Sequence, residues 1–135
     1  MENGAVETVR AYFDAWNRRD LVRMAEVLDP DVEWRRSADF PEGRTLTGSE
    51  SMLDFARSMF EVFVETPIDL RECAEIIPGE VLVAGRSRFR GDLSGAEIEA
   101  RWVRVYSVRD GAVSRVNPYP SREEAVDAVR NRPGR

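Results

Sequence analysis

The side chains that could support catalysis or ligand binding in this 135-residue chain are carboxylates, tyrosines and arginines. The sequence contains no histidine, which excludes an imidazole base, a Ser-His-Asp or Cys-His nucleophilic site and any metal site that needs a His ligand. It contains a single cysteine, Cys73, which excludes a disulfide framework and a cysteine metal cluster and indicates a reducing compartment. We therefore predict no metal site and no cofactor.

Two arginines alternate with aromatic residues on segments that have the period of a β-strand. Trp34 and Arg36 share one face of an early segment, and Trp102, Arg104 and Tyr106 share one face of a later one. A guanidinium group matches carboxylate or enolate oxygens with a planar pair of donors and stabilises negative charge. Alternatively, each arginine pairs with a nearby acid, or its stem lies along the core while its head group reaches water. The sequence leaves both interpretations open.

The elements that hold these residues follow from hydrophobic periodicity. Apolar spacings of three and four predict helices from residue 2 to about 17–20, from 21 to the Asp29-Pro30 pair, from a cap at 47–50 to Pro67, and over 121–130. Alternation predicts strands over 32–36, 68–77, 81–90, 98–108 and 113–119. Helices gathered early and strands gathered late predict one α+β domain spanning 1–135, with the helices on one face of a bent sheet.

Charge and hydropathy narrow the class of partner. The chain has 20 basic and 25 acidic residues and a net charge of −5, which argues against binding to nucleic acid. No apolar run approaches the ~20 residues of a membrane span, and the first residues lack a signal-peptide pattern. We therefore expect a cytoplasmic protein that has neither nucleic acid nor membrane as a partner.

Three stretches of the chain resemble the SnoaL-like branch of the nuclear transport factor 2-like superfamily. They are VRAYF (9–13) with NRRD (17–20), LDPDVEW (28–34), and RDGAV (109–113) leading into Tyr119 and a terminal helix. The resemblance covers nearly the whole chain and implies a strongly curved, mostly antiparallel sheet wrapped around a long N-terminal helix. It further implies a cone with a central apolar pocket, and a homodimer. Members include ketosteroid isomerases, limonene epoxide hydrolases, polyketide cyclases and dehydratases, so the fold does not fix the function.

The resemblance assigns chemistry to a few positions, and this chain departs from the family at most of them. Ketosteroid isomerases carry a tyrosine at the position of Tyr12 that donates a hydrogen bond to a developing oxyanion. Where relatives place carboxylates or a histidine, this chain has Arg36, Arg104 and Pro118. An arginine cannot act as a base at neutral pH, because its pKa stays above about 12. Tyr12, Arg36 and Arg104 remain the candidate catalytic residues, and Asp39 is either a base over the pocket mouth or a turn residue.

We predict a pocket that binds a small, partly apolar ligand carrying an anionic or carbonyl oxygen. The side chains expected to contact the ligand are Tyr12, Trp16, Trp34, Arg36, Phe55, Met59, Trp102, Arg104 and Tyr106. A catalytic version would be a cyclase, isomerase or dehydratase acting on a carbonyl compound, with Tyr12 and the arginines as electrostatic stabilisers. The alternatives are a non-catalytic ligand-binding module and a dimeric protein-interaction module.

The outer face of the sheet is the expected dimer surface. Val103 and Val105 alternate with the pocket residues, and Arg86, Arg88 and Arg90 form an outward basic stripe on the preceding strand. This face could meet a second copy of itself. Alternatively, the stripe pairs with acids on neighbouring strands.

Overall fold

The computed structural model describes residues 4–35, 45–91 and 95–131. Within these ranges the elements follow in the order α1 (Ala5–Asn17), α2 (Leu21–Glu26), β1 (Leu28–Trp34), β2 (Leu46–Thr47), α3 (Ser49–Val62), β3 (Phe63–Glu65), β4 (Ile68–Ile77), β5 (Glu80–Gly91), β6 (Glu97–Arg109), β7 (Ala112–Tyr119) and α4 (Arg122–Arg130). None of the helices in these ranges has the length and apolar character that a membrane crossing requires.

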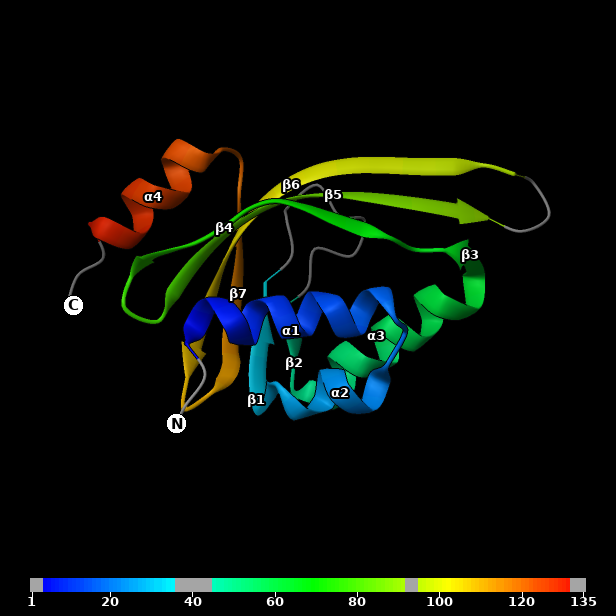
Figure 1. The fold of residues 1–135 in the computed structure, drawn as a ribbon, viewed down its shortest axis with the longest axis horizontal. Helices are drawn as coiled ribbons and strands as arrows, with labels where there is room; N and C mark the ends of the chain where they lie inside the picture. Colours follow the sequence, from blue (N-terminus) through cyan, green and yellow to red (C-terminus); the bar gives the residue numbers. More distant parts are fainter. Residues whose placement is uncertain (1–3, 36–44, 92–94, 132–135) are drawn as a thin grey trace.

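The strands form one curved sheet in the order β2-β1-β7-β6-β5-β3, and β4 also pairs with β5. All of these pairings are antiparallel except that of β1 with β7, which is parallel. Helices α1, α2 and α3 lie on one side of the sheet, α4 lies on the other, and the β5–β6 hairpin extends beyond the helices (Figure 1). The predicted α+β architecture, with a mostly antiparallel curved sheet around the N-terminal helix, is confirmed. The expectation that all helices lie on one face is wrong, because Ala125 and Val129 of α4 pack on the opposite face.

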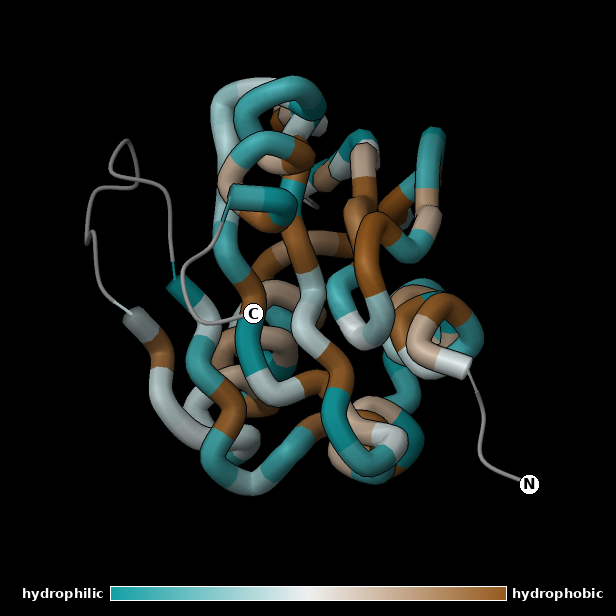
Figure 2. The backbone as a smooth tube through the Cα atoms, turned by 90° about the vertical axis from the view of Figure 1, so that its left-hand side faces the viewer, coloured by the Kyte–Doolittle hydropathy of each residue, from teal (hydrophilic) through white to brown (hydrophobic). Residues whose placement is uncertain are grey.

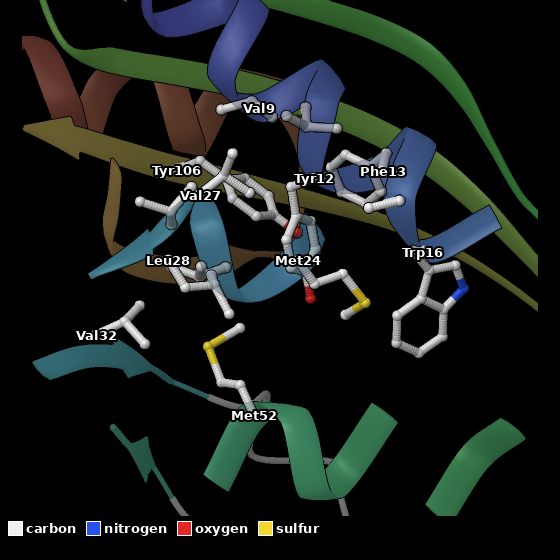
Figure 3. Close-up of a cluster of buried hydrophobic side chains, with 14 of the residues drawn as sticks. Val9, Tyr12, Phe13, Trp16, Met24, Val27, Leu28, Val32, Met52 and Tyr106 are labelled. Carbon is white, nitrogen blue, oxygen red and sulfur yellow. The ribbon is translucent and has the colours of Figure 1, made fainter. Parts of the chain in front are cut away.

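The main core lies between α1 and the sheet face that it covers. Helix α1 buries Val9, Tyr12, Phe13 and Trp16, whose spacings of three and four place them on one stripe. This stripe meets apolar residues of α2, β1, α3 and β6 (Figure 3). Hydrophilic and hydrophobic residues alternate along parts of the backbone (Figure 2), and Val81 and Val83 of β5 share the face that points to this core.

A second, smaller core lies under α4 on the opposite face. Leu82 of β5 and Val105 of β6 pack there against Ala125 and Val129 of the helix. The Ser121 hydroxyl caps α4 by accepting a hydrogen bond from the Glu124 amide at 3.1 Å, as the sequence predicts. Val105 is fully buried within one chain, so the expectation that it faces a second copy is wrong in this structure.

Two helices end earlier than their sequence pattern predicts, and in both cases a strand pairing takes the chain over. Helix α2 stops at Glu26, because Leu28 already pairs with Val113 of β7 as the start of β1. Helix α3 stops at Val62 instead of continuing to Pro67, because the following residues form β3 along the edge of β5. Tertiary pairing thus overrides local helical preference at both sites.

The loop expected between the first strand and the third helix contains a short strand, β2, that pairs with the end of β1. Helix α3 then begins after Gly48, which is its N-cap and has a φ of 92°. The cap predicted at 47–50 lies at Gly48, and no side chain forms a capping hydrogen bond there. Glycine suits the position because a positive φ is strained for residues with a Cβ atom.

Candidate functional site

A cavity of about 280 Å³ opens between α1, α3 and the concave face of the sheet. Its walls are mostly aromatic and aliphatic, and its lining residues are Tyr12, Phe13, Trp16, Trp34, Met52, Phe55, Met59, Phe63, Ile68, Ser87, Phe89, Ile98, Ala100, Trp102, Arg104, Tyr106 and Val116. This volume lies just below the ~300–1,000 Å³ typical of ligand pockets. The cavity therefore suits a small organic molecule.

The register of β5 and β6 determines which side chains reach this cavity. Every second residue of β6 from Ile98 to Tyr106 lines it. Opposite Trp102 on β5 stands Gly85, and a Cβ atom built there would lie 2.6 Å from the indole. Such a distance is a steric overlap, so only glycine lets the indole lie flat across β5. Gly85 therefore positions the Trp102 wall of the cavity.

Arg104 is the basic residue of this lining, and it is held by aromatic rings. Its guanidinium carbon lies 3.9 Å from the ring centroid of Trp102 and 5.4 Å from that of Trp34. Such stacking stabilises a cation through the ring quadrupole. One guanidinium nitrogen, Nη1, donates to the Tyr106 hydroxyl at 3.3 Å. The Trp102 ring is supported in turn by Phe13, stacked at a centroid distance of 5.8 Å.

No carboxylate in the described part of the chain forms an ion pair with Arg104. Two acids on the strands that carry the predicted site residues pair with other arginines, since Glu99 pairs with Arg86 on the outer face and Glu33 pairs with Arg115. Burial of an arginine side chain is ordinarily compensated by an acid. Here the nearest compensation within the described residues comes from indole faces and a phenol oxygen.

Two tyrosine hydroxyls accompany the guanidinium. The rings of Tyr12 and Tyr106 are 6.3 Å apart and lie side by side in Figure 3. Burial raises the pKa of Tyr12 well above its ordinary value, the neighbouring Tyr106 raises it further, and Arg104 opposes the rise. Burial likewise raises the pKa of Tyr106, against the opposing effect of Arg104. Both phenols therefore stay protonated at neutral pH and can donate hydrogen bonds.

The remaining polar atoms of the lining are donors as well, or are already engaged. The Trp102 indole nitrogen donates to the Ser87 hydroxyl at 2.9 Å, which leaves the serine proton free to donate. The Trp16 indole nitrogen donates to the Thr66 carbonyl at 2.8 Å. Among the described residues that line the cavity there is no carboxylate and no imidazole. The arrangement can bind negative charge but offers no side chain suited to accept a proton.

Arg19, which follows the C-cap of α1, binds the α3–β3 junction next to the cavity residue Phe63. Its guanidinium donates to the carbonyl oxygens of Phe60, Phe63 and Val64 at 2.8–2.9 Å, and it lies 5.1 Å from the Phe60 ring centroid. These carbonyls belong to the last turn of α3 and to β3, where helical hydrogen bonding ends. Arg19 itself has a φ of 56°. It therefore fixes the α3–β3 junction beside the cavity.

The structure brings together all of the predicted ligand contacts that it describes. Every residue of the predicted set except Arg36 lines the cavity, whereas Arg36 and Asp39 lie outside the described residues. The predicted set omitted nine lining residues, namely Phe13, Met52, Phe63, Ile68, Ser87, Phe89, Ile98, Ala100 and Val116. The alternation that selects Trp102, Arg104 and Tyr106 also reaches Ile98 and Ala100, so this signal was present in the sequence. Within the described residues, no group of three or more His, Cys, Asp or Glu side chains is arranged to hold a metal.

Comparisons with known proteins agree with this geometry. The sequence pattern of the SnoaL-like domain matches residues 9–116. An NTF2-like protein of unknown function from Burkholderia pseudomallei is similar over 92% of this chain and 95% of its own, with 23% identity and a TM-score of 0.73. A Mycobacterium tuberculosis protein in complex with estradiol-17beta-hemisuccinate is similar over 90% and 97%, with 16% identity and a TM-score of 0.75.

A third similar structure is that of TerC co-crystallised with polyporic acid. It matches over 91% of this chain and 98% of its own, with 22% identity and a TM-score of 0.71. The curated proteins contain no sequence match to this chain. At these identities, the solved structures establish that the fold is shared.

Proposed function

The chain belongs to the SnoaL-like family, and from this premise we propose that it binds a small, largely apolar molecule that carries an anionic or carbonyl oxygen. The observation that carries the proposal is the apolar cavity with the guanidinium group of Arg104 in its wall. Apolar walls supply affinity through burial, and a few placed polar groups supply orientation. Arg104, Tyr12 and Tyr106 are the proposed polar contacts.

The comparison structures support a small-molecule ligand. The Mycobacterium tuberculosis protein was crystallised with estradiol-17beta-hemisuccinate, and TerC was crystallised with polyporic acid. Both are organic molecules, and both proteins share the fold of this chain over nearly its whole length. A cavity of this kind in the present chain is therefore proposed to hold an organic molecule as well.

Binding without catalysis is the function that the described residues favour. An isomerase, cyclase or dehydratase reaction moves a proton, which requires an acceptor within hydrogen-bond reach of the substrate. The described lining supplies donors, namely Arg104 and the hydroxyls of Tyr12, Tyr106 and Ser87, but no carboxylate or imidazole. Donors of this kind stabilise an oxyanion yet leave the proton without a destination.

Tryptophan fluorescence gives a direct test, because all three tryptophans of the chain line the cavity. A library of small aromatic and alicyclic carbonyl compounds and acids is titrated against the protein. We expect saturable quenching by a subset, and Arg104→Met should weaken binding of these hits by about tenfold, the effect of losing one charge-assisted hydrogen bond. The matched control is Arg101→Met on the same strand, outside the cavity lining, which should bind as the unmodified protein does.

Saturable binding that Arg104→Met leaves unchanged would remove Arg104 from the site. A catalytic role is tested on the same hits by following their chemical conversion over time. Turnover by the unmodified protein that disappears in Tyr12→Phe would reject the non-catalytic version of the proposal.

A homodimer is proposed from the family resemblance. Within one chain, α4 covers part of the outer sheet face, which leaves the charged β5–β6 hairpin as the uncovered part. Light scattering at micromolar concentration tests the proposal, since a monomer mass there would contradict it.

A further inference from the structure

The cavity contains a positive charge that no described residue neutralises. Arg104 is half-buried, its carbon lies over the Trp102 ring, and its one hydrogen-bond partner in the described chain is the Tyr106 hydroxyl. We propose that the pocket binds its ligand as an anion, specifically a planar organic acid whose charged oxygen pairs with Arg104. This inference rests on the proposed function and selects the anionic ligand over the neutral carbonyl compound.

The first step concerns the balance of charge. A neutral ligand that closed the cavity would remove water from the guanidinium without replacing its counter-charge, and a buried unpaired charge is costly. An anionic ligand supplies that counter-charge and forms charge-assisted hydrogen bonds, which are about twice as strong as neutral ones. The same cavity therefore discriminates between the two ligand forms through Arg104.

The second step concerns the free donors. A guanidinium group that stacks on a ring uses its flat face and keeps the N–H groups at its edge, of which it has five. One of these groups is directed at the Tyr106 oxygen, and the others can reach a ligand in the plane. Arg104 is thus anchored by Trp102 while its edge is available for an oxyanion.

The third step concerns the tyrosines. Because the Tyr106 hydroxyl accepts from Arg104, its own proton is free to donate to a ligand oxygen. No hydrogen bond joins the Tyr12 hydroxyl to any residue that the structure describes, and Tyr12 lines the cavity. An oxyanion accepts from both phenols, whereas the O–H of a protonated acid would also need an acceptor. The donor set therefore favours the deprotonated ligand.

The fourth step concerns shape. The walls around Arg104 are rings, with Trp102 stacked on Phe13 and Trp34 packed edge-on against Phe55 at a centroid distance of 5.2 Å. Flat walls and a cavity of about 280 Å³ fit a ligand of one or two rings better than a bulky saturated one. A phenolate, an enolate and an aromatic carboxylate all combine a planar framework with a negatively charged oxygen.

Three probes that differ in one substituent test the inference by calorimetry. They are para-nitrophenol, para-nitrobenzoate and the neutral ketone para-nitroacetophenone, each titrated into the unmodified protein at a pH where the two acids are ionised. We expect at least one anion to bind about tenfold or more tightly than the ketone. A tenfold preference for the anion over the neutral form lowers the apparent pKa of bound nitrophenol by about 1, which its visible absorbance reports directly.

Arg104→Gln should abolish the preference while retaining weak binding, and Arg104→Lys should keep part of it, since lysine retains the charge but loses the planar fork. Arg101→Gln is the matched control and should leave the preference intact. Melting curves of each variant establish that it is folded, and Tyr106→Phe, which removes a hydroxyl and no charge, should retain the preference with weaker anion binding.

Each outcome either supports or overturns the inference that the cavity prefers an anionic ligand. Binding of nitrophenolate alone assigns a single-oxygen anion, and binding of nitrobenzoate alone assigns a carboxylate; either supports the inference. Equal affinity for the ketone and the anions overturns it while the proposed function stands. A preference that survives Arg104→Gln also overturns it, as does failure of all three probes to bind. The proposed function is decided separately by the library titration and fails when no compound of that library binds saturably.

Discussion

The two faces of the β5–β6 hairpin use the same side chain in opposite ways. On the outer face, Arg86 pairs with Asp69 and Glu99 at 3.4 Å each, and Arg90 pairs with Glu65 at 2.9 Å. On the inner face, Arg104 forms no ion pair with a described residue and lies against indole rings. All 20 basic residues of the chain are arginines, so the faces differ in what surrounds the guanidinium and not in the cation itself.

The difference follows from strand register. Arg86 stands directly opposite Asp69 on β4, and Arg90 stands opposite Glu65 on β3, so acids meet the outer arginines across the strands. The direct neighbours of Arg104 are Val83 on β5 and Pro118 on β7, neither of which carries charge. The outer arginines are thus neutralised by acids of neighbouring strands. For Arg104, the neutralising group is the anionic ligand that we propose.

The largest effect is expected from Gly85→Ala, which disturbs the inner face alone. The added Cβ would overlap the Trp102 indole at 2.6–2.7 Å, so the ring must leave the position in which it stacks on Phe13 and donates to Ser87. Overpacking of this kind costs about 1–3 kcal/mol in the free energy of unfolding. Because Arg104 stacks on the same indole, ligand binding should weaken as well. Urea denaturation and tryptophan quenching measure the two effects.

Gly4→Ala is the control for this substitution. A Cβ at Gly4 would have its nearest contact 4.0 Å away, and the residue has an ordinary φ of −64°. The control should keep ligand affinity, and because Gly4 is the N-cap of α1 and alanine caps less well, it should lose about 0.5–1 kcal/mol. If Gly85→Ala were as stable and bound as tightly as this control, Trp102 would not depend on Gly85 for its position.

The second effect is a loss of stability at alkaline pH that originates in the cavity. Burial raises the pKa of Tyr12 and Tyr106 in the folded state, so the unfolded chain loses these protons first as the pH passes about 10. The stability is therefore complete below pH 10, and above it each tyrosine lowers the free energy of unfolding by roughly 1.4 kcal/mol per pH unit. Urea midpoints in that range should fall less steeply for Tyr12→Phe and Tyr106→Phe.

The ion pair between Glu65 and Arg90 on the outer face should affect the free energy of unfolding at acid pH. The hydrogen bond and charge of Arg90 lower the pKa of the exposed Glu65 carboxyl, so its stabilising effect is present at neutral pH and disappears as the pH falls below about 4. Glu65→Gln should make the acid limb of the stability profile slightly flatter and leave the alkaline limb unchanged. An alkaline limb that persisted in the double variant Tyr12→Phe/Tyr106→Phe would place its origin elsewhere.

Much of this arrangement could be predicted from local sequence patterns. Period-two alternation places Trp102, Arg104 and Tyr106 on one face, and the spacing of Tyr12 and Trp16 places them on the buried stripe of α1. The long strands and the cap at Ser121 follow from equally local signals. These features share a cause, because each depends on residues close together in the sequence.

Other features depend on contacts between residues far apart in the sequence, so local sequence patterns could not predict them. Leu28 has a helical pattern but pairs with Val113, and Phe63 leaves its helix to pair with Gly91. The importance of Gly85 appears once the register sets it opposite Trp102. Alternation does place Glu99 on the face opposite Arg104, but the register of β5 against its neighbours is what brings Glu99 and Asp69 to Arg86.

The smallest effect comes from comparing Arg86→Met with Arg104→Met by urea denaturation in the absence of ligand. Arg86→Met removes two ion pairs whose acids are about half exposed, and it should lower the free energy of unfolding by up to about 1 kcal/mol, less in high salt. Arg104→Met loses the stacking on Trp102, worth about 0.5–1 kcal/mol, but removes a half-buried charge that no described acid compensates. These contributions oppose each other, so the stability of Arg104→Met should be unchanged or higher at any salt concentration.

An arginine that binds ligand but lowers the stability of the ligand-free protein is the compromise expected at a functional site. If Arg104→Met were the less stable of the two variants, Arg104 would be a structural residue, and the contrast between the two faces would lose its functional meaning.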